Sequence, residues 1–324
     1  MLSINQLQDT LKIVFSELRL SGQPPELYEP IHYTMALGGK RMRPLLALMA
    51  CDMFGGDVKK AMDAAIGLEL FHNFTLLHDD IMDQAPLRRG KETVYKRWNA
   101  NRAILSGDTM FAMANCYMLN TPPSCQAKVL EIFNRTAIEV CEGQQLDMNF
   151  ETRQEVSVPE YLEMIRLKTA VLLAASLQIG ALTAHAPPAY AQLLYEGGIF
   201  MGLAFQLTDD LLDLYGDEST FGKMTGGDII ANKKTYLYLS AMERSSAAQR
   251  ADLFRLFAVI PDNPETKINE VRMIFDALEM KAYTQQTINK YLDLALTQLK
   301  AIGLPEKNTA VLMDYAASLM QRQV

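Results

Sequence analysis

The chain has 324 residues, of which 49% are hydrophobic and 21% are charged, and this composition excludes a disordered protein. The formal net charge of −7 argues against a nucleic-acid partner, because the clustered basic residues are few and lie beside glycines. The N-terminal segment MLSINQLQD has no basic region followed by an apolar run, and the four cysteines show no metal-ligand spacing. We therefore expect a cytoplasmic protein with buried free thiols.

Apolar residues recur at helical spacing along most of the chain, and strand signals are scarce. Breaks fall at the proline pairs 24–25, 122–123 and 187–188, where proline suits the first turn of a new helix. The pattern predicts helices near residues 57–83, 91–119, 124–150, 159–185 and 189–215. From about residue 246 we expect shorter helices, broken near Pro261, Pro264 and Pro305.

The predicted helices are long, and their connections are short. This arrangement predicts an all-α helical bundle whose centre can hold a site. No segment rich in Gly, Ser or Pro marks a boundary, so we expect a single domain covering residues 1–324. The glycine-rich stretch 216–234 predicts a mobile loop over a site. The longest weakly polar run, Thr169 to Ala184, is shorter than the roughly 20 residues that span a bilayer, so we expect no stable membrane insertion.

A motif of three carboxylates, Asp-Asp-x-x-Asp, occurs twice: Asp79, Asp80 and Asp83, then Asp209, Asp210 and Asp213. Residues three and four apart share a helix face, so each triplet forms one carboxylate patch. Both patches lie near the C-terminal end of an apolar helix, where the helix dipole disfavours negative charge. Oxygen ligands of this kind suit Mg²⁺, which also keeps waters and substrate phosphates as ligands. The alternative of two solvated acidic helix ends is disfavoured because the motif is repeated, each time after an apolar helix.

Cationic residues beside glycines could bind the phosphates. The segment Gly38–Pro44 (GGKRMRP) combines backbone freedom with guanidinium groups that match phosphate oxygens. Further cations follow at Arg88, Arg89, Lys168, Lys223, Lys233 and Lys234. Together they predict two phosphate sites, one through metals on the aspartates and one through direct contact. Glu69 and His72 also fit half of a di-iron site, but the second Glu-x-x-His that such a site requires is missing.

The motifs resemble those of the trans-isoprenyl diphosphate synthases, the polyprenyl synthetase family that includes farnesyl and geranylgeranyl diphosphate synthases. The segments GGKRMRP, FHNFTLLHDDIMD, LRRG, LKT, FQLTDDLLD, FGKMTGGD and NKKTY occur in the family's order between residues 38 and 236. The resemblance implies an all-α bundle around a deep central cavity, usually in a homodimer. It also implies head-to-tail condensation of isopentenyl diphosphate with an allylic diphosphate such as dimethylallyl, geranyl or farnesyl diphosphate.

The resemblance further implies roles for single residues. About three Mg²⁺ ions would be held against the allylic diphosphate by Asp79, Asp83 and Asp209, while the motif's other carboxylates, Asp80, Asp210 and Asp213, would orient metals and waters. The same diphosphate would contact Arg88, Lys168, Lys223 and Lys233. The diphosphate of isopentenyl diphosphate would contact Lys40, Arg43, His72 and Arg89. Thr169 and Gln206 would lie near the developing carbocation.

Product length depends on the pocket floor, which in the family lies at Phe74 and Thr75. An ideal helix places Thr75 one turn below Asp79 on the same face and rotates Phe74 by roughly 140°. A lone aromatic at Phe74 resembles geranylgeranyl synthases of the archaeal kind, so we expect a C20 product, with C15 as the alternative. Two other functions stay open. A class I terpene cyclase does not need the GGKRMRP pocket, and a non-catalytic synthase subunit usually loses one of the aspartate motifs.

Overall fold

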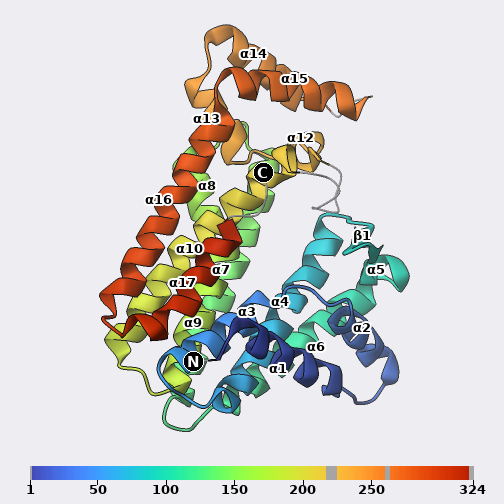
Figure 1. The fold of residues 1–324 in the computed structure, drawn as a ribbon. Coiled ribbons are helices and arrows are strands. Elements are labelled where there is room, and N and C mark those ends of the chain that lie inside the picture. The colour runs from blue at the N-terminus through green and yellow to red at the C-terminus, as the bar shows by residue number, and fades with distance from the viewer. Residues whose placement is uncertain (1, 217–224, 260–262, 321–324) are drawn as a thin grey trace. The chain divides into compact units, whose positions relative to one another are not determined.

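The computed structural model describes residues 2–216, 225–259 and 263–320, and the regular structure in them is helical apart from one pair of two-residue strands (Figure 1). The predicted all-α fold is confirmed. The chain divides into two compact units: residues 1–135, 175–195 and 304–312 form unit 1, and residues 136–174, 196–303 and 313–324 form unit 2. Four helices contribute residues to both units: α7 (Gln126–Thr152), α9 (Val171–Thr183), α10 (Pro188–Tyr215) and α17 (Glu306–Met320).

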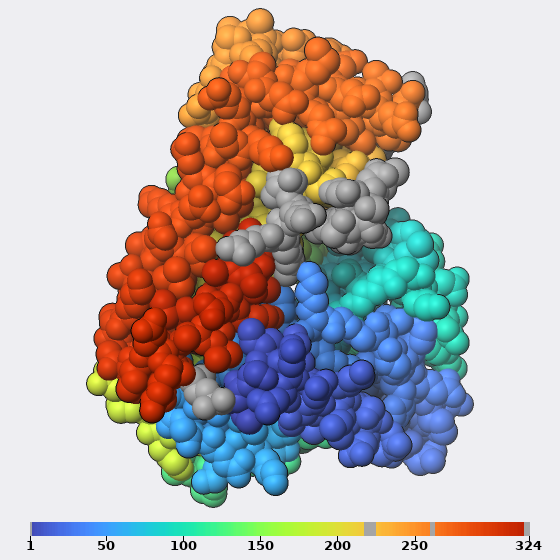
Figure 2. Space-filling view, in the orientation of Figure 1, coloured from blue at the N-terminus to red at the C-terminus, as the bar shows by residue number. Residues whose placement is uncertain are grey.

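Unit 1 is built around α4, which packs against α3 and α6 (Figure 1). Figure 2 shows the surface that α1 and α2 contribute to this unit, in dark blue. A Cβ atom on Gly180 of α9 would lie 2.1 Å from the carbonyl oxygen of Ala47 on α3, so glycine permits these two backbones to touch. The elements that lie wholly in unit 1 are, in chain order, α1 (Ile4–Glu17), α2 (Pro25–Ala36), α3 (Met42–Met53), η1 (Val58–Ala61), α4 (Met62–Met82), β1 (Leu87–Arg88), β2 (Lys91–Glu92), α5 (Val94–Arg97) and α6 (Ala100–Leu119).

Unit 2 contains a helix pair, α13 and α16, and α13 also contacts α8. In the same unit, α15 contacts α12, α14 and α16 (Figure 1). The elements of unit 2 are α8 (Val158–Ile165), the π-helical turn η2 (Arg166–Ala170), α12 (Gly227–Ile230), α13 (Tyr236–Arg244), α14 (Ala247–Phe257), α15 (Pro264–Ala277) and α16 (Met280–Ala301). The expectation of shorter helices after residue 246 is wrong for α16, which has 22 residues.

The prediction of one helix over residues 91–119 is also wrong. The segment starts with β2, which pairs antiparallel with β1, and continues through α5 before α6 begins. Arg89 and Gly90 form the turn with φ of 53° and 73°. Asn99 has an extended backbone, and its side chain accepts a hydrogen bond from the Arg102 N–H, which caps α6. Apolar periodicity does not detect such a turn or such a cap.

The cysteines and the longest apolar helical stretch differ from each other in how far they match the sequence predictions. None of the four cysteines forms a disulfide, but only Cys51 and Cys125 are buried, and the prediction of burial is wrong for the exposed Cys116 and Cys141. The continuous helical stretch Val158–Thr183 is long and apolar enough to cross a membrane. However, 78% of its most apolar window is buried inside the protein, as is typical of a core helix.

Candidate active site

The first aspartate triplet lies at the C-terminal end of α4. Asp80 points into the protein and is 5% exposed, and both Nε (2.8 Å) and Nη2 (2.6 Å) of Arg88 donate hydrogen bonds to its Oδ1. Burial raises the pKa of Asp80, and the Arg88 guanidinium acts in the opposite direction. Asp79 is half-buried and Asp83, the C-cap residue, is exposed. Arg88 therefore compensates one carboxylate, while Asp79 and Asp83 lie closer to solvent.

The second triplet lies in the last two turns of α10, in unit 2. Asp210 is 6% exposed and accepts hydrogen bonds from the hydroxyl of Tyr161 (2.5 Å) and from Nε2 of Gln206 (3.0 Å). Burial, followed by the negative charge of Asp228, raises the pKa of Asp210 to about 8. The Asp213 carboxylate accepts the backbone N–H of Asp228 (3.0 Å), which fixes the start of α12 relative to α10. Asp210 is thus held inside the unit by its own neighbours.

The carboxylates fit Mg²⁺ better than a metal with a full protein cage. Among the described residues no three His, Cys, Asp or Glu side chains are placed to hold one ion by themselves. Mg²⁺ commonly takes one or two carboxylates and completes its shell with water and substrate phosphate, so the helix-end aspartates suit it. The hypothesis of a di-iron site with Glu69 as a ligand receives no support, because Glu69 is the ion-pair partner of Arg41.

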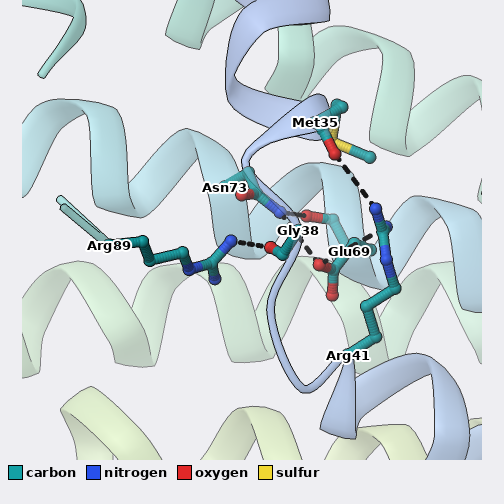
Figure 3. Close-up of polar contacts among 6 residues, drawn as sticks. All are labelled: Met35, Gly38, Arg41, Glu69, Asn73 and Arg89. Atoms are coloured by element: carbon teal, nitrogen blue, oxygen red, sulfur yellow. Dashed lines mark hydrogen bonds and ion pairs between the residues drawn. The ribbon is translucent and has the colours of Figure 1, made fainter. Parts of the chain in front are cut away.

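The cationic segment after α2 is tied to α4 through a buried network (Figure 3). Arg41 has a left-handed backbone, with φ of 44°, and its Nη2 donates to the carbonyl of Met35 (3.0 Å). Its guanidinium lies 3.9 Å from the ring centroid of Phe15 and 3.8 Å from Oε1 of Glu69. Glu69 is 2% exposed, and Nδ2 of Asn73 donates to its carbonyl (2.8 Å) and to Oε1 (3.2 Å). The buried carboxylate thus anchors the loop that carries the predicted phosphate ligands.

The predicted ligands of the second diphosphate gather at this loop. Arg89 donates to the carbonyl of Gly38 (Figure 3), and a Cβ atom on Gly39 would lie 2.6 Å from the Arg89 guanidinium. Burial and the positive charges of Arg43, Arg89 and Arg88 lower the pKa of His72 well below its usual value. His72 is therefore neutral at neutral pH and can donate one N–H to an anion.

Lys40 lines a cavity of about 650 Å³ between α1 and the loop that follows α2. The other lining residues include Lys12, Arg19 and His32 as well as apolar side chains from α1. Lys40 is exposed, so it can reach an anion on the outer side of the loop. The structure thus brings Arg43, His72 and Arg89 together and places Lys40 on the same loop.

Lys168 and Thr169 lie on the π-helical turn η2, which joins α8 to α9. The Lys168 ammonium lies 2.5 Å from Oδ2 of Asp147 on α7. A Cβ atom on Gly143 would lie 2.3 Å from the Lys168 backbone nitrogen, so glycine lets α7 press against the turn. The Thr169 hydroxyl donates to Oε1 of Gln206 (3.0 Å), which connects the turn to α10. Single π turns of this kind occur frequently at functional sites.

Residues 217–224 of the predicted loop, including Lys223, lie outside the described residues, and the described remainder contains the short helix α12. Lys233 is described, and its backbone N–H donates to the carbonyl of Asp228 (2.9 Å). The Lys234 ammonium donates to the carbonyl of Phe150 (2.8 Å), which ties this segment to the end of α7. Lys233 therefore follows a short, well-anchored turn after α12.

The two candidate chain-length residues differ as the helix geometry predicts. The ring of Phe74 stacks on that of Phe111 on α6 at 5.3 Å and also contacts Phe71 at 5.5 Å. The Thr75 hydroxyl donates to the carbonyl of His72 (2.8 Å), within its own helix. Phe74 therefore packs on the flank towards α6, as expected from its rotation away from the face of Asp79.

Sequence reasoning missed several residues that hold this site. Glu69 was considered only as an iron ligand, and Asp147, Tyr161 and Asp228 were not considered. One signal was available for Tyr161, because it precedes Lys168 by two helical turns and so shares a face with it. For the other three, no spacing in the sequence indicates the partner.

The chain is similar to known proteins in sequence and in structure. A family model described as Polyprenyl synthetase matches residues 24–278. A geranylgeranyl diphosphate synthase of Sulfolobus acidocaldarius is 40% identical over 99% of this chain and 96% of its own length. A geranylfarnesyl diphosphate synthase of Natronomonas pharaonis is 33% identical over 93% and 91%. Among solved structures, a geranylgeranyl pyrophosphate synthase matches with a TM-score of 0.95 at 44% identity and covers both chains completely.

Proposed function

The chain belongs to the polyprenyl synthetase family of prenyltransferases, and we propose that it condenses isopentenyl diphosphate head to tail with allylic diphosphates to give geranylgeranyl diphosphate. The primers would be dimethylallyl, geranyl and farnesyl diphosphates. Farnesyl diphosphate, the C15 product, is the alternative, and the names of the similar proteins do not favour it.

One observation carries this proposal: the charges of Arg43, Arg88 and Arg89 act together on His72, in the same unit as Asp79 and Asp83. The arginine cluster fits a diphosphate bound without metal, and Asp79 with Asp83 fits a diphosphate bound through Mg²⁺. A condensing enzyme needs both kinds of site, whereas a terpene cyclase needs only the second. We therefore assign Lys40, Arg43, His72 and Arg89 to isopentenyl diphosphate.

The allylic diphosphate is assigned to the remaining ligands: Arg88, Lys168, Lys223 and Lys233 directly, and Asp79, Asp83, Asp209, Asp210 and Asp213 through Mg²⁺. The chemistry that about three Mg²⁺ ions supply when bound is neutralisation of the departing diphosphate. Asp80 keeps Arg88 in place through its two hydrogen bonds. Asp147 does the same for Lys168.

The protein then has to protect and direct a carbocation. Thr169 and Gln206 form a hydrogen-bonded pair whose oxygen dipoles can stabilise positive charge. Lys168 and Thr169 are consecutive residues on the π turn, so the group assigned to the diphosphate adjoins the group assigned to the cation. The double bond of isopentenyl diphosphate, held in alignment, attacks this cation. Proton loss to the released diphosphate completes the reaction.

The test is a product analysis of purified protein with Mg²⁺, isopentenyl diphosphate and each primer in turn. A dominant C20 product would support the proposal in full, and C15 would support the enzyme but overturn the length. A hydrocarbon formed from an allylic diphosphate alone would indicate a cyclase. Turnover only after addition of a partner protein would indicate a subunit of a heteromeric synthase.

Chain length is assigned to Phe74, with Thr75 lining the cavity. Phe74→Ala opens space beside α6, so we expect products longer than C20. The matched control is Phe200→Ala, which removes a half-buried ring stacked on Tyr291 at 6.3 Å in unit 2. If Phe74→Ala and Phe200→Ala both leave the product length unchanged, Phe74 does not set it.

We also propose that the protein is a cytoplasmic homodimer, that residues 1–324 act as one synthase domain, and that no nucleic acid or membrane is a partner. Support for a dimer comes from α6, which exposes Ile104 (41%), Leu105 (58%) and Leu119 (49%). Light scattering after size exclusion tests it: twice the chain mass for wild type and a monomer for Leu105→Glu are expected. A wild-type monomer would contradict it.

A further inference from the structure

Tyr161, which no part of the proposed mechanism uses, is hydrogen-bonded to the second aspartate triplet. It lies on α8, is 4% exposed, and its hydroxyl lies 2.5 Å from Oδ2 of Asp210. A buried carboxyl group needs hydrogen-bond partners to compensate for lost water, and the bond from Tyr161 is at the short end of the range for O–H···O bonds. The hydroxyl therefore fixes the rotation of the Asp210 carboxylate.

The hydrogen bonds continue from Asp210 to the two residues assigned to the cation. Oδ1 of Asp210 accepts from Nε2 of Gln206 (3.0 Å), and Oε1 of Gln206 accepts from the Thr169 hydroxyl (3.0 Å). Nε2 of Gln206 is the donor in this bond, so the amide presents its NH₂ group to Asp210. Its carbonyl oxygen then has to point the other way, towards Thr169. The orientation of the Gln206 amide thus depends on Asp210 being held in place.

We propose that Tyr161 is a positioning residue, which acts through Asp210 to keep the Gln206 amide oxygen turned towards Thr169. The inference rests on the proposed function, which places Gln206 and Thr169 near the developing carbocation. An amide oxygen stabilises positive charge, whereas the NH₂ group in its place would repel it. Through Gln206, the hydroxyl of Tyr161 therefore acts on the transition state.

The test is Tyr161→Phe, which removes only the hydroxyl. We expect kcat to fall about tenfold while KM for both substrates and the Mg²⁺ activation curve stay unchanged, because the amide acts on the transition state. The matched control is Tyr236→Phe, since Tyr236 is also buried (3% exposed) and its hydroxyl lies 3.0 Å from Oγ1 of Thr287. A merely structural role predicts the same small loss of thermal stability and the same unchanged kcat for both variants, which would overturn the inference.

A double-mutant cycle with Gln206→Met separates the possible failures. If Tyr161 acts through Gln206, then Tyr161→Phe should lower kcat in the wild type and not in the Gln206→Met background. If Gln206→Met lowers kcat and Tyr161→Phe does not, the inference is wrong and the proposed function stands. If Gln206→Met itself leaves kcat unchanged, the role given to Gln206 under the proposed function fails, and the inference fails with it.

A second variant covers the case in which Tyr161→Phe does not fold. In Asp210→Asn, the amide oxygen of the new side chain can still accept the hydrogen bond from Tyr161. Its NH₂ group then faces Gln206, and the Gln206 amide must flip to present its oxygen to that group. Asp210 is also assigned to Mg²⁺, so kcat is measured at saturating Mg²⁺ and compared in two backgrounds: we expect it to fall in the wild type and not in Gln206→Met. An equal fall in both backgrounds would show that Asp210 acts on the metal alone and would overturn the inference.

Discussion

The contact between α10 and the π turn yields a prediction that can be worked out from distances. A Cβ atom on Gly202 would lie 2.4 Å from the Cα of Ala170 and 2.5 Å from its Cβ. Carbon atoms in ordinary contact lie about 3.5–4.0 Å apart, so Gly202→Ala requires the two backbones to separate by about 1 Å. Gly197 lies on the same helix, and its added Cβ would meet its nearest neighbours at 3.4 Å, an ordinary contact. Gly197→Ala is therefore the matched control.

The two variants share one contribution to the free energy of unfolding and differ in a second. Replacing glycine by alanine inside a helix is favourable by about 1 kcal/mol, and this gain applies equally to both. Overpacking a well-filled interior costs about 1–3 kcal/mol, and only Gly202→Ala incurs it. We expect Gly202→Ala to be less stable than Gly197→Ala by about 2 kcal/mol. With a urea dependence of about 3 kcal/mol/M, this difference lowers the urea midpoint by about 0.7 M.

The activity of the same variants provides a second measurement. A shift of about 1 Å between the turn and α10 would stretch the bond from Thr169 to Gln206, and misplacement by this distance can cost about a hundredfold in rate. We expect kcat of Gly202→Ala to fall by tenfold or more and that of Gly197→Ala to stay near wild type. Equal stability and equal kcat in the two variants would refute the close contact and the reasoning built on it.

Three further predictions concern other parts of the molecule. Glu69→Gln removes the charge that anchors Arg41, so KM for isopentenyl diphosphate should rise about tenfold at similar kcat. The control is Asp63→Asn on the same helix, which should match wild type in steady-state kinetics. Hydrogen bonds from Ser157 lower the pKa of Glu160 from 4.5 to about 2. The stability that this carboxylate contributes is therefore present at pH values above its pKa in the unfolded chain, and it is lost as the pH falls towards 2. Thermal unfolding should therefore show Glu160→Gln to be less stable than wild type near neutral pH and equally stable at about pH 2, and a pH-independent difference would contradict this assignment. Chelation of Mg²⁺ should abolish condensation and leave the helical circular dichroism unchanged, because the metals bind with substrate and not as part of the fold; loss of helicity would contradict that view.

Local patterns in the sequence were enough to predict the helical fold and the carboxylate patches. Apolar spacing follows the 3.6-residue period of the helix, so α4, α7 and α10 begin and end close to the predicted positions. The same period puts three aspartates on one face wherever Asp-Asp-x-x-Asp occurs in a helix. The arginines near His72 could be proposed because they lie on segments whose motifs resemble those of a known family.

Other features depend on contacts between segments far apart in the chain, which no local pattern records. The break between α5 and α6 depends on a cap and a turn, and the π turn depends on glycines of α7 and α10 that let both helices approach it. The pairing of Asp80 with Arg88, of Lys168 with Asp147 and of Asp210 with Tyr161 requires side chains to be desolvated together. The sequence by itself therefore determined which residues could carry the chemistry. Only the tertiary structure decided which carboxylates face solvent and which are held by buried partners, because burial and hydrogen bonding arise when separate helices pack.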